Sequence, residues 1–226
     1  MSNRLVVAAL AVALAGSAFA APPESHLLPP DQHSSEKARG LARKYADALR
    51  ELNLGIYHCL PWLVVPNNSI GFFKPKHLAS DARYLSLRVY VEQDASPQFT
   101  ALDFEGRASA MYSRYVGEML RRMTRDASLR ADADVDGFSV IIGWLKQTTQ
   151  GGQPVHETIA IFADRATAAD FLGGRAKIAD FAGRTVVLGF DGQQALGPVR
   201  LKAWEDNFVS NFQVANYQPA PGVTCR

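Results

Sequence analysis

The amino-acid sequence predicts an α+β protein with a largely antiparallel sheet, and with one long amphipathic helix and an N-terminal helix packed on one face of that sheet. Three observations lead to this fold class. Apolar side chains recur at three- and four-residue steps over residues 36–53 and 103–125, as in helices that bury one face. Apolar and polar side chains alternate over residues 84–92, which indicates a strand. A Gly-Gly pair at 151–152 separates two apolar runs and predicts a hairpin, which joins antiparallel strands.

The N-terminal segment has the three parts of a secretory signal peptide. Arg4 supplies the positive charge, residues 5–15 are an apolar run, and Ala18-Phe19-Ala20 fits the small-x-small rule of a cleavage site. We therefore expect residues 1–20 to be removed after Ala20 and the protein to be periplasmic or secreted. The alternative, a membrane anchor, would need an apolar run of about 20 residues. We expect the mature chain not to span a membrane.

A proline-rich linker and a helix are expected next. Residues 21–34 begin with four prolines in ten residues, which favours an extended linker, and residues 35–226 are expected to form a single domain. Over residues 36–53 the apolar positions form one helical face, and Gly55 suits the residue that ends such a helix.

Three strand candidates follow this helix. Residues 56–65 are apolar but contain Pro61, which favours an edge strand or an extended segment. Residues 70–73 suit a short strand. In residues 84–92 four aliphatic side chains point to one face, and Tyr84 and Tyr90 point to the other, where they either form a contact surface or pack on a cross-strand neighbour.

The long helix over residues 103–125 carries a row of arginines opposite its apolar side. At 100° per residue, Arg107, Arg114, Arg121 and Arg125 fall within about 40° of one another. Such a stripe could bind anionic groups, or it could be an ordinary solvated helix face. The later elements predicted are strands at 138–146, 155–163, 185–190, 199–204 and 208–214, and short helices at 164–172 and 178–181.

Two cysteines are present, at positions 59 and 225. In an oxidising compartment they most simply form one disulfide, Cys59–Cys225. The alternative is a nucleophilic Cys59 assisted by His58, but adjacent side chains on a strand point to opposite faces. The disulfide would close a loop of about 165 residues, which corresponds to an upper figure of about 5 kcal/mol of stabilisation.

The motif Asp132-x-Asp134-x-Asp136-Gly137 is the strongest candidate for a metal site. Acidic residues at the first, third and fifth positions, followed by Gly, begin a typical Ca²⁺ loop. The twelfth position, which is Glu in an EF-hand, is here Gly143, and a strand is expected to follow. A different kind of Ca²⁺ loop remains an alternative to a solvated acidic turn. We expect the three carboxylates to splay into solvent and to bind Ca²⁺ weakly or not at all.

Composition and missing motifs limit the function further. With 47% hydrophobic residues, 20% charged residues and a net charge of +2, the chain is neither disordered nor a dedicated nucleic-acid binder. No nucleophile-elbow, phosphate-loop or dinucleotide-binding motif occurs, so we identify no catalytic or cofactor-binding residue. The sequence favours a non-enzymatic binding or interaction protein of the cell envelope, whose partner is a protein or a small molecule. The alternative is a Ca²⁺-dependent binding or hydrolytic protein that uses residues 132–136.

Overall fold

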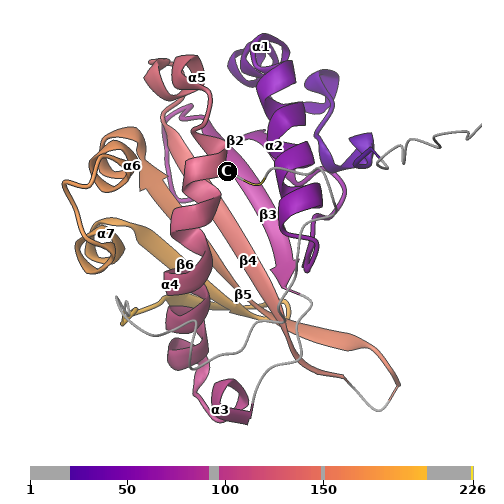
Figure 1. The fold of residues 1–226 in the computed structure, drawn as a ribbon, viewed down its shortest axis with the longest axis vertical. Helices are drawn as coiled ribbons and strands as arrows, with labels where there is room; N and C mark the ends of the chain where they lie inside the picture. The colour runs from indigo at the N-terminus through magenta and orange to yellow at the C-terminus, as the bar shows by residue number, and fades with distance from the viewer. Residues whose placement is uncertain (1–20, 92–96, 149–150, 203–224, 226) are drawn as a thin grey trace, which may run out of the picture.

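The fold has two layers, a mixed sheet and a set of helices that cover one of its faces (Figure 1). The computed structural model describes residues 21–91, 97–148, 151–202 and 225. The predicted signal peptide therefore lies outside the described residues. Within them the α+β class is confirmed, and no helix there is long and apolar enough to cross a bilayer.

The sheet has seven strands among the described residues, in the order β1-β3-β4-β5-β6-β7, with β2 paired to the same edge of β3 as β1. All pairs are antiparallel except β3–β4, which is parallel. A parallel pair requires a crossover, and α4 provides it. The strands are β1 Leu63–Val64, β2 Ile70–Phe73, β3 Tyr84–Val91, β4 Gly137–Thr148, β5 Pro154–Asp164, β6 Val186–Asp191 and β7 Gln194–Pro198.

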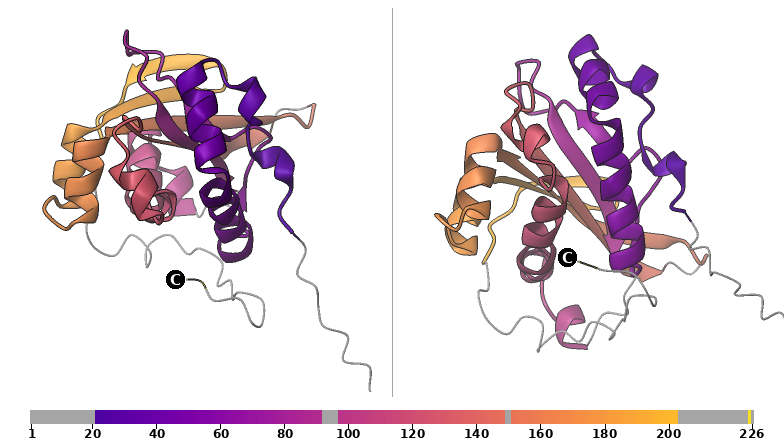
Figure 2. Two further views of the ribbon diagram at one scale, coloured as in Figure 1. Left: turned by 90° about the horizontal axis from the view of Figure 1, so that it is seen from above. Right: turned by 45° about the horizontal axis from the view of Figure 1, so that its top comes forward.

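The helices all lie on the same side of the sheet, as the left view of Figure 2 shows. The longest, α4, begins at Asp103, whose side chain accepts a hydrogen bond from the Gly106 N–H at 2.7 Å. This helix crosses in front of β3 and β4 in Figure 1. The α-helices are α1 Glu36–Lys44, α2 Ala46–Cys59, α3 Pro97–Thr100, α4 Phe104–Met123, α5 Ala127–Ala131, α6 Arg165–Leu172 and α7 Ile178–Arg184.

The core lies between α4, α2 and the helix-covered face of the sheet. The four aliphatic side chains of β3 are buried there, as the alternation predicted, in one cluster with Met119 and Met123. The core-facing residues of β3 and β4 are Leu85, Leu87, Val89, Val91, Phe138, Val140, Ile142 and Trp144.

The predicted single helix over residues 36–53 is in fact two helices, and the predicted end at Gly55 is wrong. The chain turns at Tyr45, and α2 then continues through Gly55 to Cys59. Continuing the helix buries Ile56 completely in the core. Gly55 is also a point of close approach, because its carbonyl accepts a hydrogen bond from Arg122 Nη1 at 3.1 Å. The strand expected over residues 56–65 is therefore reduced to β1.

The last predicted strands also change. A tight turn at Gly192, with φ of +57°, starts β7 at Gln194, and β7 ends at Pro198. The strand expected over residues 199–204 is therefore wrong at 199–202, and its last two residues lie outside the described residues. The strand expected over residues 208–214 lies outside the described residues.

The proline-rich segment packs on the domain. It contains two short 3-10 turns, η1 Glu24–His26 and η2 Pro30–Gln32, and Leu27 forms a parallel bridge with Ile70 of β2. His33 is 2% exposed, and its Nε2 accepts the Phe72 N–H at 3.2 Å. Its Nδ1 lies 3.0 Å from the Pro29 carbonyl, so this nitrogen carries the proton. Residues 21–34 are thus bonded to the edge of the sheet rather than separate from it.

Candidate functional site

The acidic turn is bound to basic and phenolic groups of the N-terminal helices. Asp132 Oδ2 accepts hydrogen bonds from Lys44 Nζ and Tyr45 Oη, both at 2.7 Å. Asp136 Oδ2 accepts from Lys37 Nζ at 2.8 Å and from the Arg83 N–H at 2.7 Å. The bond from Lys44, followed by those from the Asp134 N–H and Tyr45, lowers the pKa of Asp132 to about 2.

The expected splaying into solvent is therefore wrong for Asp132, whose side chain is 9% exposed. Asp134 is the exposed member of the three. Asp132 and Asp136 are held by different lysines, and the described residues contain no group of three or more His, Cys, Asp or Glu placed to hold a metal ion. The turn thus joins α5 to β4 and ties both to α1.

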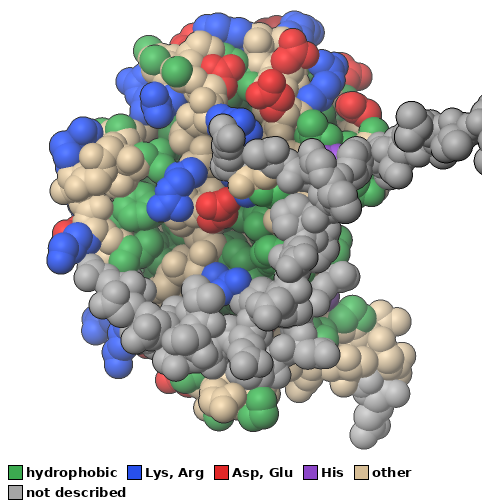
Figure 3. All heavy atoms as spheres, viewed as in Figure 1, with side chains coloured by type: hydrophobic (Ala, Val, Ile, Leu, Met, Phe, Trp, Pro, Cys, Tyr) green, Lys and Arg blue, Asp and Glu red, His purple; other side chains and the backbone are tan. Residues whose placement is uncertain are grey.

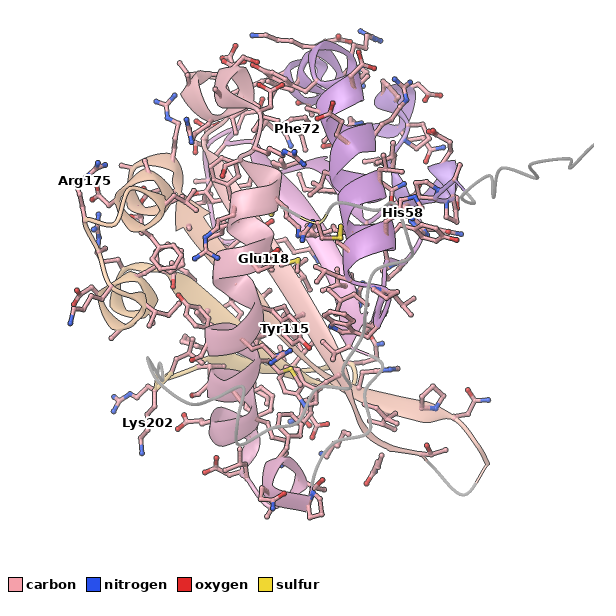
Figure 4. The ribbon with its side chains drawn as sticks, viewed as in Figure 1. His58, Phe72, Tyr115, Glu118, Arg175 and Lys202 are labelled. Carbon is pink, nitrogen blue, oxygen red and sulfur yellow. A yellow bond between two sulfur atoms is a disulfide. The ribbon has the colours of Figure 1, made fainter. Side chains whose placement is uncertain are left out.

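The predicted disulfide between Cys59 and Cys225 is confirmed. The two Cα atoms are 5.5 Å apart, and the bond links the last residue of α2 to the penultimate residue of the chain. Figure 4 shows it as a yellow bond beside α2. Cys59 is thus bonded to Cys225 and is not a free nucleophile.

The arginines of α4 do not form one exposed stripe. Arg107 makes a two-bond ion pair with Glu157 of β5, with both N···O distances at 2.7 Å, and its side chain is 15% exposed. Arg114 Nε and Nη1 are buried and have no hydrogen-bond partner in the structure as described. Only Arg121 and Arg125, near the end of the helix, are exposed.

These two arginines line a pocket of about 320 Å³ between α2 and α4. Two of its acidic groups have partners within the fold. Glu118, labelled in Figure 4, pairs with Arg122 at 2.7 Å. Asp126 caps α5 by accepting from the Ser128 N–H at 2.7 Å. Three acidic and three basic side chains line the pocket, so their formal charges balance.

The ion pair of Arg107 and Glu157 is the polar cluster that the sequence analysis missed. Glu157 Oε2 also accepts the Trp144 Nε1–H at 2.8 Å, so this carboxylate is fully paired. The bond to Glu157 raises the pKa of Arg107. One signal could have found it: Glu157 is in phase with Ile159, Ile161 and Ala163, so it faces the core. A buried carboxylate requires a cationic partner.

No protein-family model matches this chain, and neither a curated protein nor a solved structure is similar to it. Function is therefore inferred from the residues themselves.

The face of the sheet opposite the helices is here called the outer face, and the described helices do not cover it (Figure 2, left). One part of it is covered by other residues, because Ser86 and Ser139 are buried and the His77 ring lies 4.8 Å from the Phe162 ring. Strand register places its side chains in three cross-strand rows. Leu145 and Val186 are 44% and 43% exposed on it. The rows are Val64-Tyr90-Gly143-Thr158-Phe190, then Arg88-Ile141-Ala160-Leu188, and then Ser86-Ser139-Phe162-Val186.

Tyrosine rings on the outer face cover glycines of the neighbouring strand. A Cβ on Gly143 would lie 2.4 Å from the Tyr90 ring, and a Cβ on Gly137 would lie 2.6 Å from the Tyr84 ring. The Tyr90 and His156 ring centroids are 4.8 Å apart. Each tyrosine thus packs on a cross-strand neighbour, as one of the two sequence interpretations held.

The outer face differs in charge from the helix-covered side. Figure 3 shows Lys, Arg, Asp and Glu side chains gathered over α1, α5, α6 and α7. In the three outer-face rows, Arg88 is the one side chain with a permanent charge, and it donates to Tyr90 Oη at 2.6 Å. An apolar and weakly charged surface of this kind suits the burial of another apolar surface.

Proposed function

We propose that this is an exported protein of the cell envelope that works by binding another protein through its outer face, without catalysis. The observation that carries the proposal is the apolar outer face. Large exposed apolar patches on folded proteins mark interaction sites, because water contact with that surface is unfavourable. Aromatic side chains are enriched at protein interfaces, whereas small molecules prefer concave sites.

Export is supported by two features. The sequence of residues 1–20 has the pattern of a signal peptide, and the Cys59–Cys225 disulfide is compatible with an oxidising compartment. A binding role agrees with the internal pairing of the polar clusters. Glu157 and Asp132 each accept several hydrogen bonds from the fold itself, and such carboxylates are poor general bases.

The proposal can be tested with a photo-cross-linking amino acid placed at Val186, in cells that express the full chain. The matched control places it at Leu54 of α2, which is 44% exposed on the helix-covered side, while Val186 is 43% exposed. We expect a discrete cross-linked product from position 186 and none from position 54. Products of equal yield from both positions, or from neither, would refute the role of the outer face.

Export and the absence of catalysis need separate measurements. The mass of the exported protein should correspond to cleavage after Ala20. Turnover of any member of a panel of ester, peptide, glycoside and phosphate substrates would contradict the binding role.

A further inference from the structure

Residues 21–34, here called the strap, form hydrogen bonds along the edge of β2 that faces away from β3. The Leu28 N–H donates to the Ile70 carbonyl, and the Ser69 N–H donates to the His26 carbonyl, both at 2.8 Å. Leu27 also forms a parallel bridge with Ile70. The strap thus occupies an edge whose backbone groups would otherwise be open to another strand.

His33, near the end of the strap, is held to β2 through a ring nitrogen that must be unprotonated. Its Nδ1 donates to the Pro29 carbonyl at 3.0 Å, and its Nε2 accepts the Phe72 N–H at 3.2 Å. The ring packs closely on the strand, because a Cβ on Gly71 would lie 3.0 Å from Nε2. Histidinium carries a proton on both nitrogens. A protonated His33 would therefore point an N–H at the Phe72 N–H, and this bond would be lost.

The surroundings of His33 oppose a positive charge on its ring. Burial, the largest cause, lowers the pKa of His33 below 6.5, and the charges of Arg83 and Arg39 act in the same direction. Each arginine already pairs with a carboxylate of its own. β2 carries no titratable side chain. The charged residues on the other elements around His33 are Asp31 of η2, Glu36, Lys37 and Arg39 at the start of α1, and Asp81 and Arg83 before β3.

We infer that the strap is an acid-sensitive switch, in which protonation of His33 Nε2 breaks its bond to β2 and releases residues 21–34 from the edge of the sheet. Histidine suits this role because its charge changes in the pH range that an exported protein meets. The released edge exposes the Ile70 carbonyl and the Phe72 N–H, which are backbone groups of the kind that an added strand pairs with. The switch lies at the edge of β2 and does not depend on the outer face.

The second histidine of the strap provides a matched control. His26 Nδ1 lies 2.9 Å from Asn53 Oδ1. Asn53 Nδ2 donates to the Pro23 carbonyl at 3.1 Å, so the atom that faces His26 is the oxygen, which only accepts. His26 Nδ1 is therefore the donor, and a proton added to the other ring nitrogen leaves this bond intact. Of the two histidines, only His33 should couple the strap to pH.

Amide hydrogen exchange of the full mature chain, followed residue by residue by NMR between about pH 7 and about pH 5, tests the switch. Each rate is divided by the intrinsic rate at the same pH to give a protection factor. We expect the protection of the Leu28, Ser69 and Phe72 amides to fall by up to about tenfold for each pH unit below 6.5, because release takes up one proton. The Leu87 amide of β3 should stay far more protected than these three at every pH, since the strap opens without unfolding the sheet.

Two variants separate the histidines. His33→Gln keeps an acceptor for the Phe72 N–H but has no proton to gain, so its strap amides should keep their protection as the pH falls. His26→Gln should show the same fall as the wild-type protein. Circular dichroism checks that both variants are folded.

Three outcomes would overturn the switch. The first is a wild-type protein whose strap amides keep their protection between about pH 7 and about pH 5. The second is strap amides that are protected as strongly as Leu87 at every pH, since they would then exchange only when the whole domain unfolds. The third is an equal fall in His33→Gln. The first two are measured on the wild-type chain and need no variant.

Discussion

Glu157→Gln tests the buried ion pair between β5 and α4 through its effect on stability. The Glu157 side chain is 2% exposed and accepts hydrogen bonds from Arg107 Nε and Nη2 and from Trp144 Nε1. Glutamine has the same size but no charge, and its NH₂ group would face a guanidinium donor. The Arg107 charge, which is 15% exposed, would lose its anion.

The expected loss follows from this burial. Removing one partner of a buried ion pair costs about 3–5 kcal/mol, because the other charge stays desolvated and unpaired. Arg107 keeps some access to water, so we expect the lower end, about 3 kcal/mol. Lys146 Nζ, 4.0 Å from Glu157 Oε1, offers no relief because it has the same charge as Arg107.

Urea unfolding at pH 7 measures the effect as a lower midpoint with an unchanged slope. Glu36→Gln is the control, since Glu36 pairs with Arg39 at 2.6 Å but is 82% exposed, and it should leave the unfolding midpoint almost unchanged. Adding Arg107→Met to Glu157→Gln removes the unpaired charge, so the double variant should be more stable than Glu157→Gln alone. A cost below about 1 kcal/mol for Glu157→Gln, or a double variant no more stable than it, would refute the reasoning.

Four further predictions concern other parts of the fold. Leu87→Ala should lower the free energy of unfolding by roughly 2–5 kcal/mol, since Leu87 is fully buried; a loss below about 1 kcal/mol would contradict this. Burial lowers the pKa of His33 below its ordinary value of 6.5. As the pH drops below 6.5, the unfolded chain therefore binds a proton at this histidine before the folded chain does, and the free energy of unfolding should fall. This pH dependence of stability should be absent in His33→Gln. Asp134→Ala should change stability by less than about 0.5 kcal/mol, and millimolar Ca²⁺ should not raise the melting temperature; a stabilisation by Ca²⁺ that this variant abolishes would restore the calcium hypothesis. Intact mass should show that Cys59 and Cys225 of the exported protein are alkylated only after reduction, whereas two free thiols before reduction would contradict the disulfide.

The sequence predicted only one part of the candidate site, the side chains that β3 contributes to the outer face. Alternation in β3 placed Tyr84 and Tyr90 opposite the core, and the structure has them there. The central strands gave no such signal, because residues 138–146 and 155–163 are apolar at most positions on both faces. Such strands are typical of sheets covered on both sides, but here helices cover only one. The uncovered face could therefore be recognised only after the helices were placed.

The sequence did not predict the ion pairs between residues far apart in the chain either. Lys44 and Asp132 are 88 residues apart, and Arg107 and Glu157 are 50 residues apart. The spacing of the four arginines does place them on one side of the helix. Arg107, the first of them, is nevertheless largely buried because it pairs with Glu157. The acidic turn has the spacing of a Ca²⁺ loop. In the structure, however, Lys44 and Tyr45 donate hydrogen bonds to Asp132, and Lys37 donates one to Asp136.

By itself, the sequence determined those features that depend on neighbouring residues or on simple counting. These are the periodicity of α4 and β3, the short strand at residues 70–73 and the pairing of the two cysteines. Tertiary structure alone decided the parallel register of β3 and β4, the continuation of α2 through Gly55, the partners of Glu157 and Asp132, and the exposure of the outer face. The physical reason is that each of these depends on contacts between residues far apart in the chain. Their free energy is gained only when the sheet and helices pack together, and local propensity does not encode it.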